Sequence, residues 1–260
     1  MLRLSANLST LFGELSFLER FGAARRAGFA AGEFQYGYDH DLADVREALA
    51  EAGLPLVLIN TPRGSRPNDR GLAAIPGREA EFREGMEQAL EWSRTLGNRF
   101  IHVMSGAPGD GDTRDACVEV WRGNMAWAVA QAREAGVELL IEALNPVDVP
   151  GYFVRSLDDA VDLLEMIGTQ GAGLLFDVYH CARSGEPVVP AMKACAGWIR
   201  HIQIADSPSR GEPGTGDVDW ASVFEAIEAS GYRGYLGAEY IPRNGTLEGL
   251  AWAKPYLEQS

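Results

Sequence analysis

The sequence predicts an α/β protein that folds as a (β/α)₈ TIM barrel, and three observations lead to this prediction. An apolar, strand-like run followed by an amphipathic helix recurs eight times along the chain. Several runs, such as 54–59 and 174–176, are continuously apolar, as expected of parallel strands covered on both faces. Eight such units in 260 residues match the usual size of this barrel, so residues 1–260 are expected to form a single domain.

The predicted strands recur at intervals that leave room for one helix between them. They begin near Arg3, Ala30, Leu54, Arg99, Val137, Gly171, Trp198 and Gly234. In the first helix, Ser16 and Glu19 form an S-x-x-E capping box, and Gly28 can adopt the left-handed conformation that ends a helix. Glycine ends later units in the same way at Gly53, Gly97, Gly136, Gly168 and Gly231.

The remaining helices show similar start signals. The third is expected to begin near Pro76, and Ser156 and Asp219 are expected to cap two later helices. Two segments rich in glycine, proline and charge, 61–75 and 205–218, follow the third and seventh strands. In a barrel they are loops at the face where active sites lie. A doubly wound open sheet is the alternative, but the turn after the first strand lacks G-x-G-x-x-G.

Composition excludes several classes of function. The net charge of −14 opposes broad contact with nucleic acid, so no nucleic-acid partner is expected. No apolar run approaches the roughly 20 residues of a membrane span, and the N-terminus lacks the features of a signal peptide. No membrane association and a cytoplasmic location are therefore expected. The three cysteines fit neither a disulfide framework nor a thiolate zinc site.

Four polar residues follow the apolar runs of the fifth to eighth predicted strands. Glu142, Asp177, Gln203 and Glu239 are separated by 35, 26 and 36 residues, about one strand-helix-strand unit each. Because parallel strands of a barrel end at one mouth, the four side chains are expected to meet. Taken alone, each could be a helix cap or a solvated side chain. Together, three carboxylates and an amide oxygen suit Mg²⁺ or Mn²⁺, whereas zinc is less favoured because a Gln stands where a His would suit it.

These residues lie in segments that resemble the hydroxypyruvate isomerase family. The segments are Leu4-Ser5-Ala6-Asn7-Leu8, Ile75-Pro76-Gly77-Arg78-Glu79, Ile141-Glu142-Ala143-Leu144-Asn145, Phe176-Asp177-Val178-Tyr179-His180, His201-Ile202-Gln203-Ile204-Ala205-Asp206, Arg210-Gly211-Glu212-Pro213-Gly214-Thr215-Gly216 and Gly237-Ala238-Glu239-Tyr240. That family belongs to the xylose isomerase-like barrels, which include sugar epimerases and 2-oxo-tetronate isomerases. The resemblance spans nearly the whole chain, and the run from Arg210 to Gly216 is its most specific part.

The resemblance implies a divalent metal, Mg²⁺ or Mn²⁺, held by Glu142, Asp177, Gln203 and Glu239. It also implies that Glu142 and Glu239 move the proton in an enediol mechanism that interconverts hydroxypyruvate and 2-hydroxy-3-oxopropanoate, a reaction of carbohydrate and glyoxylate metabolism. A 2-oxo-tetronate isomerase or a ketose epimerase with the same site is the nearest alternative. A non-enzymatic, metal-bound barrel that binds sugar acids is another.

The resemblance also suggests residues that bind a small anionic hydroxy or oxo acid. His180 is expected to reach a substrate oxygen, Arg210 to bind the substrate carboxylate or a hydroxyl, and Asp148 to contact the substrate. Asn60 and Arg70 are added from their position alone, at the end of the third strand and in its loop. Structural or solvated roles are the alternatives for all five. A homodimer or larger homo-oligomer is the expected assembly.

His201 lies two residues before Gln203 in the seventh predicted strand. Residues two apart on a strand face the same side, so His201 is expected one layer deeper than Gln203 in the barrel. A structural part, or support of the site from below, is expected of it.

Overall fold

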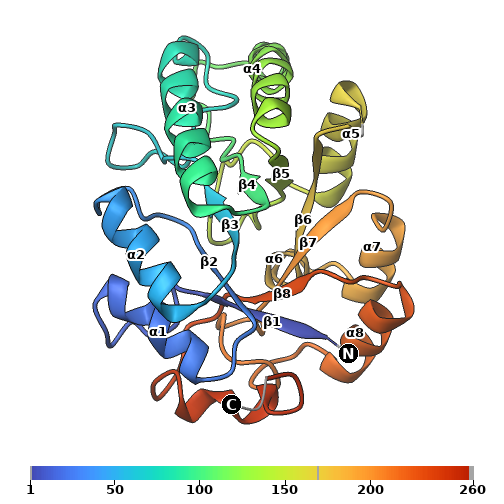
Figure 1. Cartoon of the computed structure of the whole chain (residues 1–260). Coiled ribbons are helices and arrows are strands. Elements are labelled where there is room, and N and C mark those ends of the chain that lie inside the picture. The colour runs from blue at the N-terminus through green and yellow to red at the C-terminus, as the bar shows by residue number, and fades with distance from the viewer. Residues whose placement is uncertain (1, 169, 258–260) are drawn as a thin grey trace.

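The computed structural model describes residues 2–168 and 170–257 and shows a closed barrel of eight parallel strands (Figure 1). Successive strands pair along the chain, and β1 closes the barrel on β8. The strands are β1 Arg3–Asn7, β2 Ala31–Phe34, β3 Leu56–Asn60, β4 Phe100–His102, β5 Glu138–Glu142, β6 Ala172–Asp177, β7 Ile199–Ile204 and β8 Tyr235–Ala238. The helices are α1 Phe17–Arg26, α2 Leu42–Ala52, α3 Glu79–Leu96, α4 Arg114–Glu134, α5 Leu157–Ile167, α6 Val178–Arg183, α7 Val188–Ala194, α8 Trp220–Ala229 and the 3₁₀ helix η1 Glu248–Ala253.

The predicted fold class is confirmed, and the open doubly wound sheet is wrong. Each strand begins within two residues of its predicted start. The predicted domain of residues 1–260 includes residues 1, 169 and 258–260, which lie outside the described residues. None of the described helices is long and apolar enough to cross a membrane.

Local capping explains why most helices begin and end where the sequence predicts. The Glu19 carboxylate accepts hydrogen bonds from the backbone N–H of Ser16 at 3.1 Å and from its hydroxyl at 2.5 Å. Ser156 and Asp219 cap α5 and α8. The six glycines predicted to end helices all have positive φ: Gly28, Gly53, Gly97, Gly136, Gly168 and Gly231.

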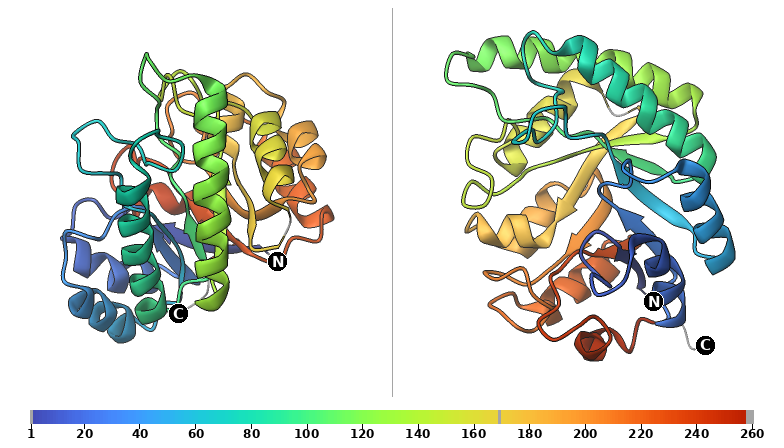
Figure 2. Two further views of the ribbon diagram at one scale, coloured as in Figure 1. Left: turned by 90° about the horizontal axis from the view of Figure 1, so that it is seen from above. Right: turned by 90° about the vertical axis from the view of Figure 1, so that its left-hand side faces the viewer.

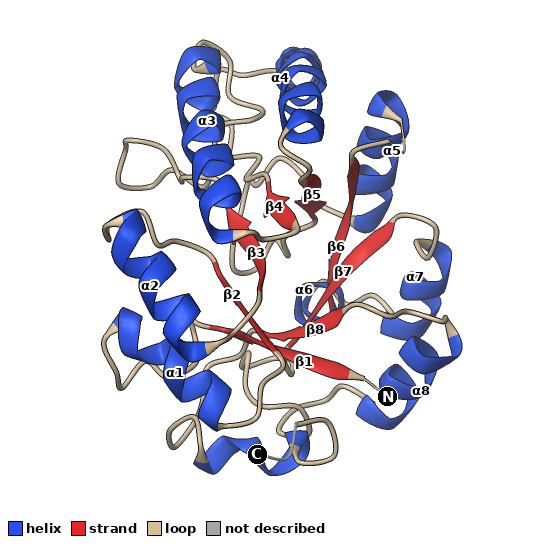
Figure 3. Cartoon of the chain, in the orientation of Figure 1, coloured by secondary structure: helices blue, strands red, loops and turns tan. Residues whose placement is uncertain are grey.

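Two helical predictions need correction. Helix α3 begins at Glu79 rather than near Pro76, because Ile75 and Arg78 first complete a turn in which the N–H of Arg78 donates to the carbonyl of Ile75 at 3.2 Å. The sixth unit carries two short helices, α6 and α7, instead of one. Helix α6 follows β6 without a loop, so it begins at the carboxyl end of that strand; Figure 3 views it nearly end-on, inside the outer ring of helices.

Side chains that point into the barrel form two layers of different character. The deeper layer is apolar and includes Ala31, Leu58, Phe100, Leu140 and Leu175. Two residues further along the same five strands, the buried side chains are Glu33, Asn60, His102, Glu142 and Asp177. The outward-facing residues of the strands pack against the surrounding helices, which form the outer layer in Figure 2. The carboxyl ends of the strands therefore enclose a buried polar layer.

Candidate active site

The four predicted ligands lie on neighbouring strand ends and are all buried. Asp177 and Gln203 are register partners between β6 and β7, and Gln203 pairs with Gly237 of β8, two residues before Glu239. Glu142, at the end of β5, is 6% exposed, and the other three ligands are no more than 4% exposed. Burial of three carboxylates in one layer is unfavourable unless cations or hydrogen-bond donors compensate.

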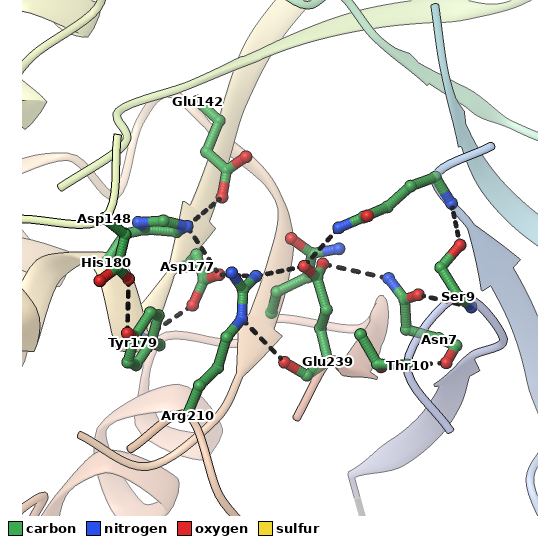
Figure 4. Close-up of polar contacts among 12 residues, drawn as sticks. Asn7, Ser9, Thr10, Glu142, Asp148, Asp177, Tyr179, His180, Arg210 and Glu239 are labelled. Atoms are coloured by element: carbon green, nitrogen blue, oxygen red, sulfur yellow. Dashed lines mark hydrogen bonds and ion pairs between the residues drawn. The ribbon is translucent and has the colours of Figure 1, made fainter. Parts of the chain in front are cut away.

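Arg210 supplies one such cation and links two of the carboxylates. Its guanidinium donates to the Glu239 carboxylate and lies 3.7 Å from Oδ2 of Asp177. Its Nε donates to the backbone carbonyl of Glu239 at 3.4 Å. Figure 4 shows the side chain extending between Asp177 and Glu239. The structure thus brings Arg210 to the predicted metal ligands.

The backbone of Arg210 explains this orientation. Its φ of 53° is in the left-handed region, which is uncommon outside glycine and often marks a functional site. The Arg210 carbonyl accepts the N–H of Ile241 at 2.8 Å, which ties the turn to the segment after β8.

Asp206 organises the loop that carries Arg210. Its carboxylate accepts hydrogen bonds from the backbone of Gly214 at 2.7 Å and Thr215 at 2.9 Å and from the Trp220 indole at 2.9 Å. A Cβ on Gly216 would lie 2.0 Å from the carbonyl oxygen of Ser207, so only glycine fits there. The glycines of the predicted motif therefore serve the packing of this loop.

His180 lies in α6, which places it beside the carboxylates. Its Nε2 is 3.9 Å from both Oε1 of Glu142 and Oδ2 of Asp177. Its Nδ1 accepts the backbone N–H of Asn145 at 3.0 Å, so the ring proton must be on Nε2, which faces the site. Burial lowers the pKa of His180 to about 4. The residue is therefore a neutral hydrogen-bond donor aimed at the carboxylate cluster.

Asp148 contacts Tyr179 and Asn145, the neighbours of His180, and does not lie among the predicted ligands. Its carboxylate accepts the hydroxyl of Tyr179 at 2.5 Å and the amide N–H of Asn145 at 3.0 Å. Burial raises its pKa, but the hydrogen bonds from Tyr179 and Asn145 outweigh this effect, and the net shift is downward. Asp148 thereby holds Asn145, the residue that fixes the His180 tautomer. Its predicted contact with a substrate stays a prediction.

Glu239 is held by residues at the ends of the next two strands around the barrel, β1 and β2. Its carboxylate accepts the amide of Asn7 at 3.0 Å and the amide of Gln35 at 2.7 Å, in addition to Arg210. Sequence reasoning missed both amides. Both are polar residues at the end of a predicted strand, Asn7 of the first and Gln35 of the second, so their positions were a usable signal.

Glu142 and Glu239 both have a higher pKa than ordinary surface carboxylates. Burial, followed by repulsion from Asp177 and Glu239, raises the pKa of Glu142 well above its usual value. Burial also raises the pKa of Glu239, and Arg210 offsets only part of that shift. His102, whose Nδ1 is 3.6 Å from Glu142, has its pKa lowered to about 3 by burial and is neutral. Both glutamates can therefore hold a proton near neutral pH.

The residues fit a divalent cation. One Asp177 oxygen caps α6 by accepting the N–H of Tyr179 at 2.7 Å, and the other, Oδ2, is buried and has no hydrogen-bond partner among residues 2–168 and 170–257. Atoms of Glu142, Asp177 and His180 lie within 4.8 Å of one another, a spacing suited to a cation. The protonated Nε2 of His180 argues against that residue as a ligand, whereas carboxylate and amide oxygens suit a hard ion.

Two predicted binding residues are not brought to this cluster. Asn60 is buried at the end of β3, where its amide contacts the sulfur of Met104 at 3.5 Å. Arg70 is exposed in the loop after β3. Within residues 2–168 and 170–257, neither makes a hydrogen bond or ion pair with the four predicted ligands, and their roles stay predictions.

The chain resembles known proteins along nearly its whole length. Residues 21–256 match the xylose isomerase-like TIM barrel family. The chain is 42% identical over 259 residues to a 2-oxo-tetronate isomerase of Cupriavidus necator, covering 99% of both chains. It is 39% identical over 257 residues to a hydroxypyruvate isomerase of Escherichia coli, covering 98% of this chain and all of that one. A crystal structure described as an AP endonuclease of family 2 from Brucella melitensis superposes with a TM-score of 0.96 at 38% identity, covering 99% and 100% of the two chains.

Proposed function

The chain belongs to the xylose isomerase-like TIM barrel family. We propose that it is an isomerase that interconverts hydroxypyruvate and 2-hydroxy-3-oxopropanoate. Relatives named hydroxypyruvate isomerase and 2-oxo-tetronate isomerase match almost the entire chain at 39% and 42% identity. The observation that carries the proposal is the pair of buried glutamates, Glu142 and Glu239, which lie at neighbouring strand ends on either side of Asp177.

The reaction needs one proton removed from a carbon and one returned to its neighbour through an enediol. Glu142 and Glu239 project from β5 and β8, so they can reach adjacent carbons of a bound substrate from different sides. Burial raises the pKa of both carboxylates, which makes them better acceptors of a carbon-bound proton, and a bound cation would offset part of that shift. In either direction, one glutamate takes a proton from one carbon and the other returns a proton to its neighbour, while the hydroxyl that becomes a carbonyl loses its proton and the former carbonyl oxygen gains one.

Two further side chains can hold the substrate during these steps. His180 points its Nε2–H at the space between Glu142 and Asp177, where it can donate to a substrate oxygen. Arg210 carries the positive charge beside Glu239 and can pair with the substrate carboxylate. The α6 helix and the loop around Asp206 fix the two groups.

Glu142, Asp177, Gln203 and Glu239 would hold a divalent cation, with Mg²⁺ or Mn²⁺ as the ion that suits these oxygens. When bound, such an ion polarises the carbonyl and hydroxyl oxygens of the substrate and stabilises negative charge on the enediol. Oδ2 of Asp177 supports this assignment, because it is buried and accepts no hydrogen bond from the described residues, with Arg210 3.7 Å away.

A 2-oxo-tetronate isomerase is the second candidate. The relative that bears this name is 42% identical, slightly above the 39% of the hydroxypyruvate isomerase. The same glutamates would act on a four-carbon 2-oxo acid, and the loops at the mouth would decide the substrate length.

Nucleic-acid chemistry is less favoured than isomerisation, although one similar structure is described as an endonuclease. The net charge of −14 repels phosphate backbones, and the only His within the described group of candidate cation ligands is His180.

We also propose a cytoplasmic location and a homodimer or larger homo-oligomer.

A substrate panel tests the proposal. Hydroxypyruvate, 2-oxo-tetronates and free ketoses are each incubated with the chelated protein, with and without added Mg²⁺ or Mn²⁺, and products are separated by chromatography. We expect metal-dependent turnover of hydroxypyruvate. Preferential turnover of 2-oxo-tetronates would select the second candidate, and preference for free ketoses would overturn the assignment to an oxo acid.

A further inference from the structure

Glu33 is a fully buried charged side chain that the proposed chemistry does not use. It lies in β2 and is 0% exposed. Its Oε2 is 2.9 Å from Nε2 of His201, which is also 0% exposed. A buried carboxylate in a barrel interior is retained only where its hydrogen bonds compensate for the loss of water.

The carboxylate of Glu33 spans the barrel to reach a predicted ligand on β7. Its Oε1 accepts Nε2 of Gln203 at 2.7 Å, although β1 and β8 lie between β2 and β7 in the strand order. Gly237 leaves room for this reach, because a Cβ there would lie 2.4 Å from Oε1 of Glu33. The absence of a side chain at position 237 is therefore required for the contact.

The contact determines which end of the Gln203 amide faces the cation site. An ionised carboxylate only accepts hydrogen bonds, so the amide nitrogen of Gln203 must face Glu33. The amide oxygen of Gln203 then faces the cation site. It is the only atom of this side chain that can bind a hard cation. The other Glu33 oxygen, Oε2, lies 2.9 Å from Nε2 of His201, so both oxygens of Glu33 face nitrogen atoms of neighbouring side chains.

The same carboxylate is also connected to Glu239. Nδ2 of Asn7 donates to Oε1 of Glu33 at 3.3 Å and to Oε2 of Glu239 at 3.0 Å. The Asn7 oxygen accepts the N–H of Ser9 at 3.1 Å, so both amide hydrogens are directed at the two carboxylates. Glu33 thus contacts one predicted ligand, Gln203, directly and a second, Glu239, through the amide of Asn7.

We propose that Glu33 is a positioning residue that orients the amide of Gln203, with its oxygen toward the divalent cation. The inference rests on the metal site of the proposed function. It predicts that reach matters more than charge: a shorter acid at position 33 cannot contact Gln203 across the barrel, whereas an amide of equal length still can.

Two conservative variants separate these effects. Glu33→Asp keeps the charge and loses the reach. Glu33→Gln keeps an acceptor oxygen for Gln203 and loses the charge. Its amide nitrogen can donate to Nε2 of His201 once the ring proton is on Nδ1. Nδ1 can carry that proton, because it has no hydrogen-bond partner in the described chain. Asn124→Ala is the matched control, since it removes another buried hydrogen bond, to the carbonyl of Ala73 at 2.9 Å, away from the predicted ligands.

The measurement is the Kd of Mn²⁺ for the substrate-free protein, determined by calorimetry and by the loss of the free-ion paramagnetic resonance signal. Glu33→Asp should raise Kd by roughly 10- to 100-fold, the usual effect of losing a partner of a metal ligand. Glu33→Gln and Asn124→Ala should stay within about threefold of wild type, well below that range. Thermal unfolding curves report whether each variant folds.

The possible failures are distinguishable. Wild-type protein that binds no Mn²⁺ would refute the metal site and this inference together. Wild-type binding with an unchanged Kd in Glu33→Asp, or with a larger loss in Glu33→Gln than in Glu33→Asp, would overturn the positioning role alone.

A second pair keeps the inference testable should Glu33→Asp not fold. Gln203→Glu offers the cation a charged ligand but sets two carboxylates against each other, so positioning predicts weaker Mn²⁺ binding at neutral pH. Adding Glu33→Gln supplies an N–H for the new carboxylate and should restore binding. Tighter binding by Gln203→Glu alone would contradict the proposed role.

Discussion

The two proposed proton carriers have very different surroundings. Glu239 accepts hydrogen bonds from three side chains, Arg210, Gln35 and Asn7. The side chain of Glu142 makes no hydrogen bond within the described chain, and its nearest imidazole nitrogens, of His102 and His180, lie 3.6 and 3.9 Å away. Both glutamates lie at strand ends of one barrel, but other strands and loops supply hydrogen-bond donors to Glu239 and not to Glu142.

This difference assigns different properties to the two acids. Donors orient Glu239 and favour its charged form, whereas Glu142 faces burial and the negative charges of Asp177 and Glu239 with little compensation. Glu142 is therefore the acid that gains most from taking up a proton, and Glu239 is the one whose position is most closely fixed.

The largest expected effect is the loss of turnover in Glu142→Gln and Glu239→Gln. Removal of a general acid–base group lowers kcat by roughly 10²- to 10⁴-fold, and we expect both variants to fall in that range while remaining folded. Steady-state kinetics on the preferred substrate measures it. Glu119→Gln, at an exposed position paired with Arg122, is the matched control.

Stability should distinguish these two variants even though activity does not. In the chelated protein, Glu142→Gln should raise Tm because it removes a poorly compensated charge. Glu239→Gln should lower Tm, because Arg210 then loses a buried partner, at a cost of about 1–3 kcal/mol. Shifts of the same sign in both variants would contradict the contrast between the two sites.

The next effect concerns Arg210, which contacts Glu239 and not Glu142. Arg210→Met should lower kcat/KM by roughly 10- to 100-fold, since it removes hydrogen bonds to charged groups and the charge available to a substrate carboxylate. Arg210→Lys should recover only part of the loss, because a lysine lacks the planar fork. Arg200→Met, which breaks an ion pair with Glu138 at 2.9 Å, serves as the control. Full activity of Arg210→Met would show that Arg210 has no role in turnover or substrate binding.

The origin of this contrast also explains what could be predicted from the sequence. Strand periods, caps and strand-end residues are local patterns, so the barrel and the positions of Glu142 and Asp177 followed from them. Asn7 and Gln35 act on Glu239 only because β1 pairs with β8 and closes the barrel. The strand-end positions of Asn7 and Gln35 are visible in the sequence, but nothing local indicates that both contact Glu239.

Glu33 is an intermediate case. A lone acid within the apolar segment 29–34 is a visible anomaly in the sequence, but nothing beside it along the chain indicates what it contacts. Its partner His201 was correctly expected one layer below Gln203. Asn60, chosen from the end of a strand, does lie in the polar layer inside the barrel, whereas the length of a loop does not specify where the Arg70 side chain points.

A third prediction concerns the pH dependence of stability without metal. The pKa of Glu142 is raised above its ordinary value of 4.5 on folding, so between that value and the folded pKa the folded protein binds more protons than the unfolded chain. Its stability should therefore decrease as pH rises through this window, by up to about 1.4 kcal/mol for each pH unit.

The measurement is Tm against pH from about 5 to 8 in the presence of chelator, a range that starts just above the ordinary carboxylate value. Glu142→Gln should flatten the decline more than Glu239→Gln, since Arg210 already offsets part of the upward pKa shift at Glu239. Added Mn²⁺ should also counter the decline. Stability that increases with pH in the chelated wild type would show that the two carboxylates are not the poorly compensated charges.

The smallest effect tests whether the support of Glu239 is specific. Gln35→Leu removes one of its three donors, at 2.7 Å, and should lower kcat/KM by about twofold to tenfold, as for the loss of a single hydrogen bond. Combined with Glu239→Gln, the change should add almost nothing, because residues that act through one contact are not additive. Combined with Glu142→Gln, the two losses should multiply, because Gln35 does not contact that acid. A double-variant cycle measures both couplings, and equal coupling to the two glutamates would mean that Gln35 supports the barrel mouth as a whole rather than Glu239.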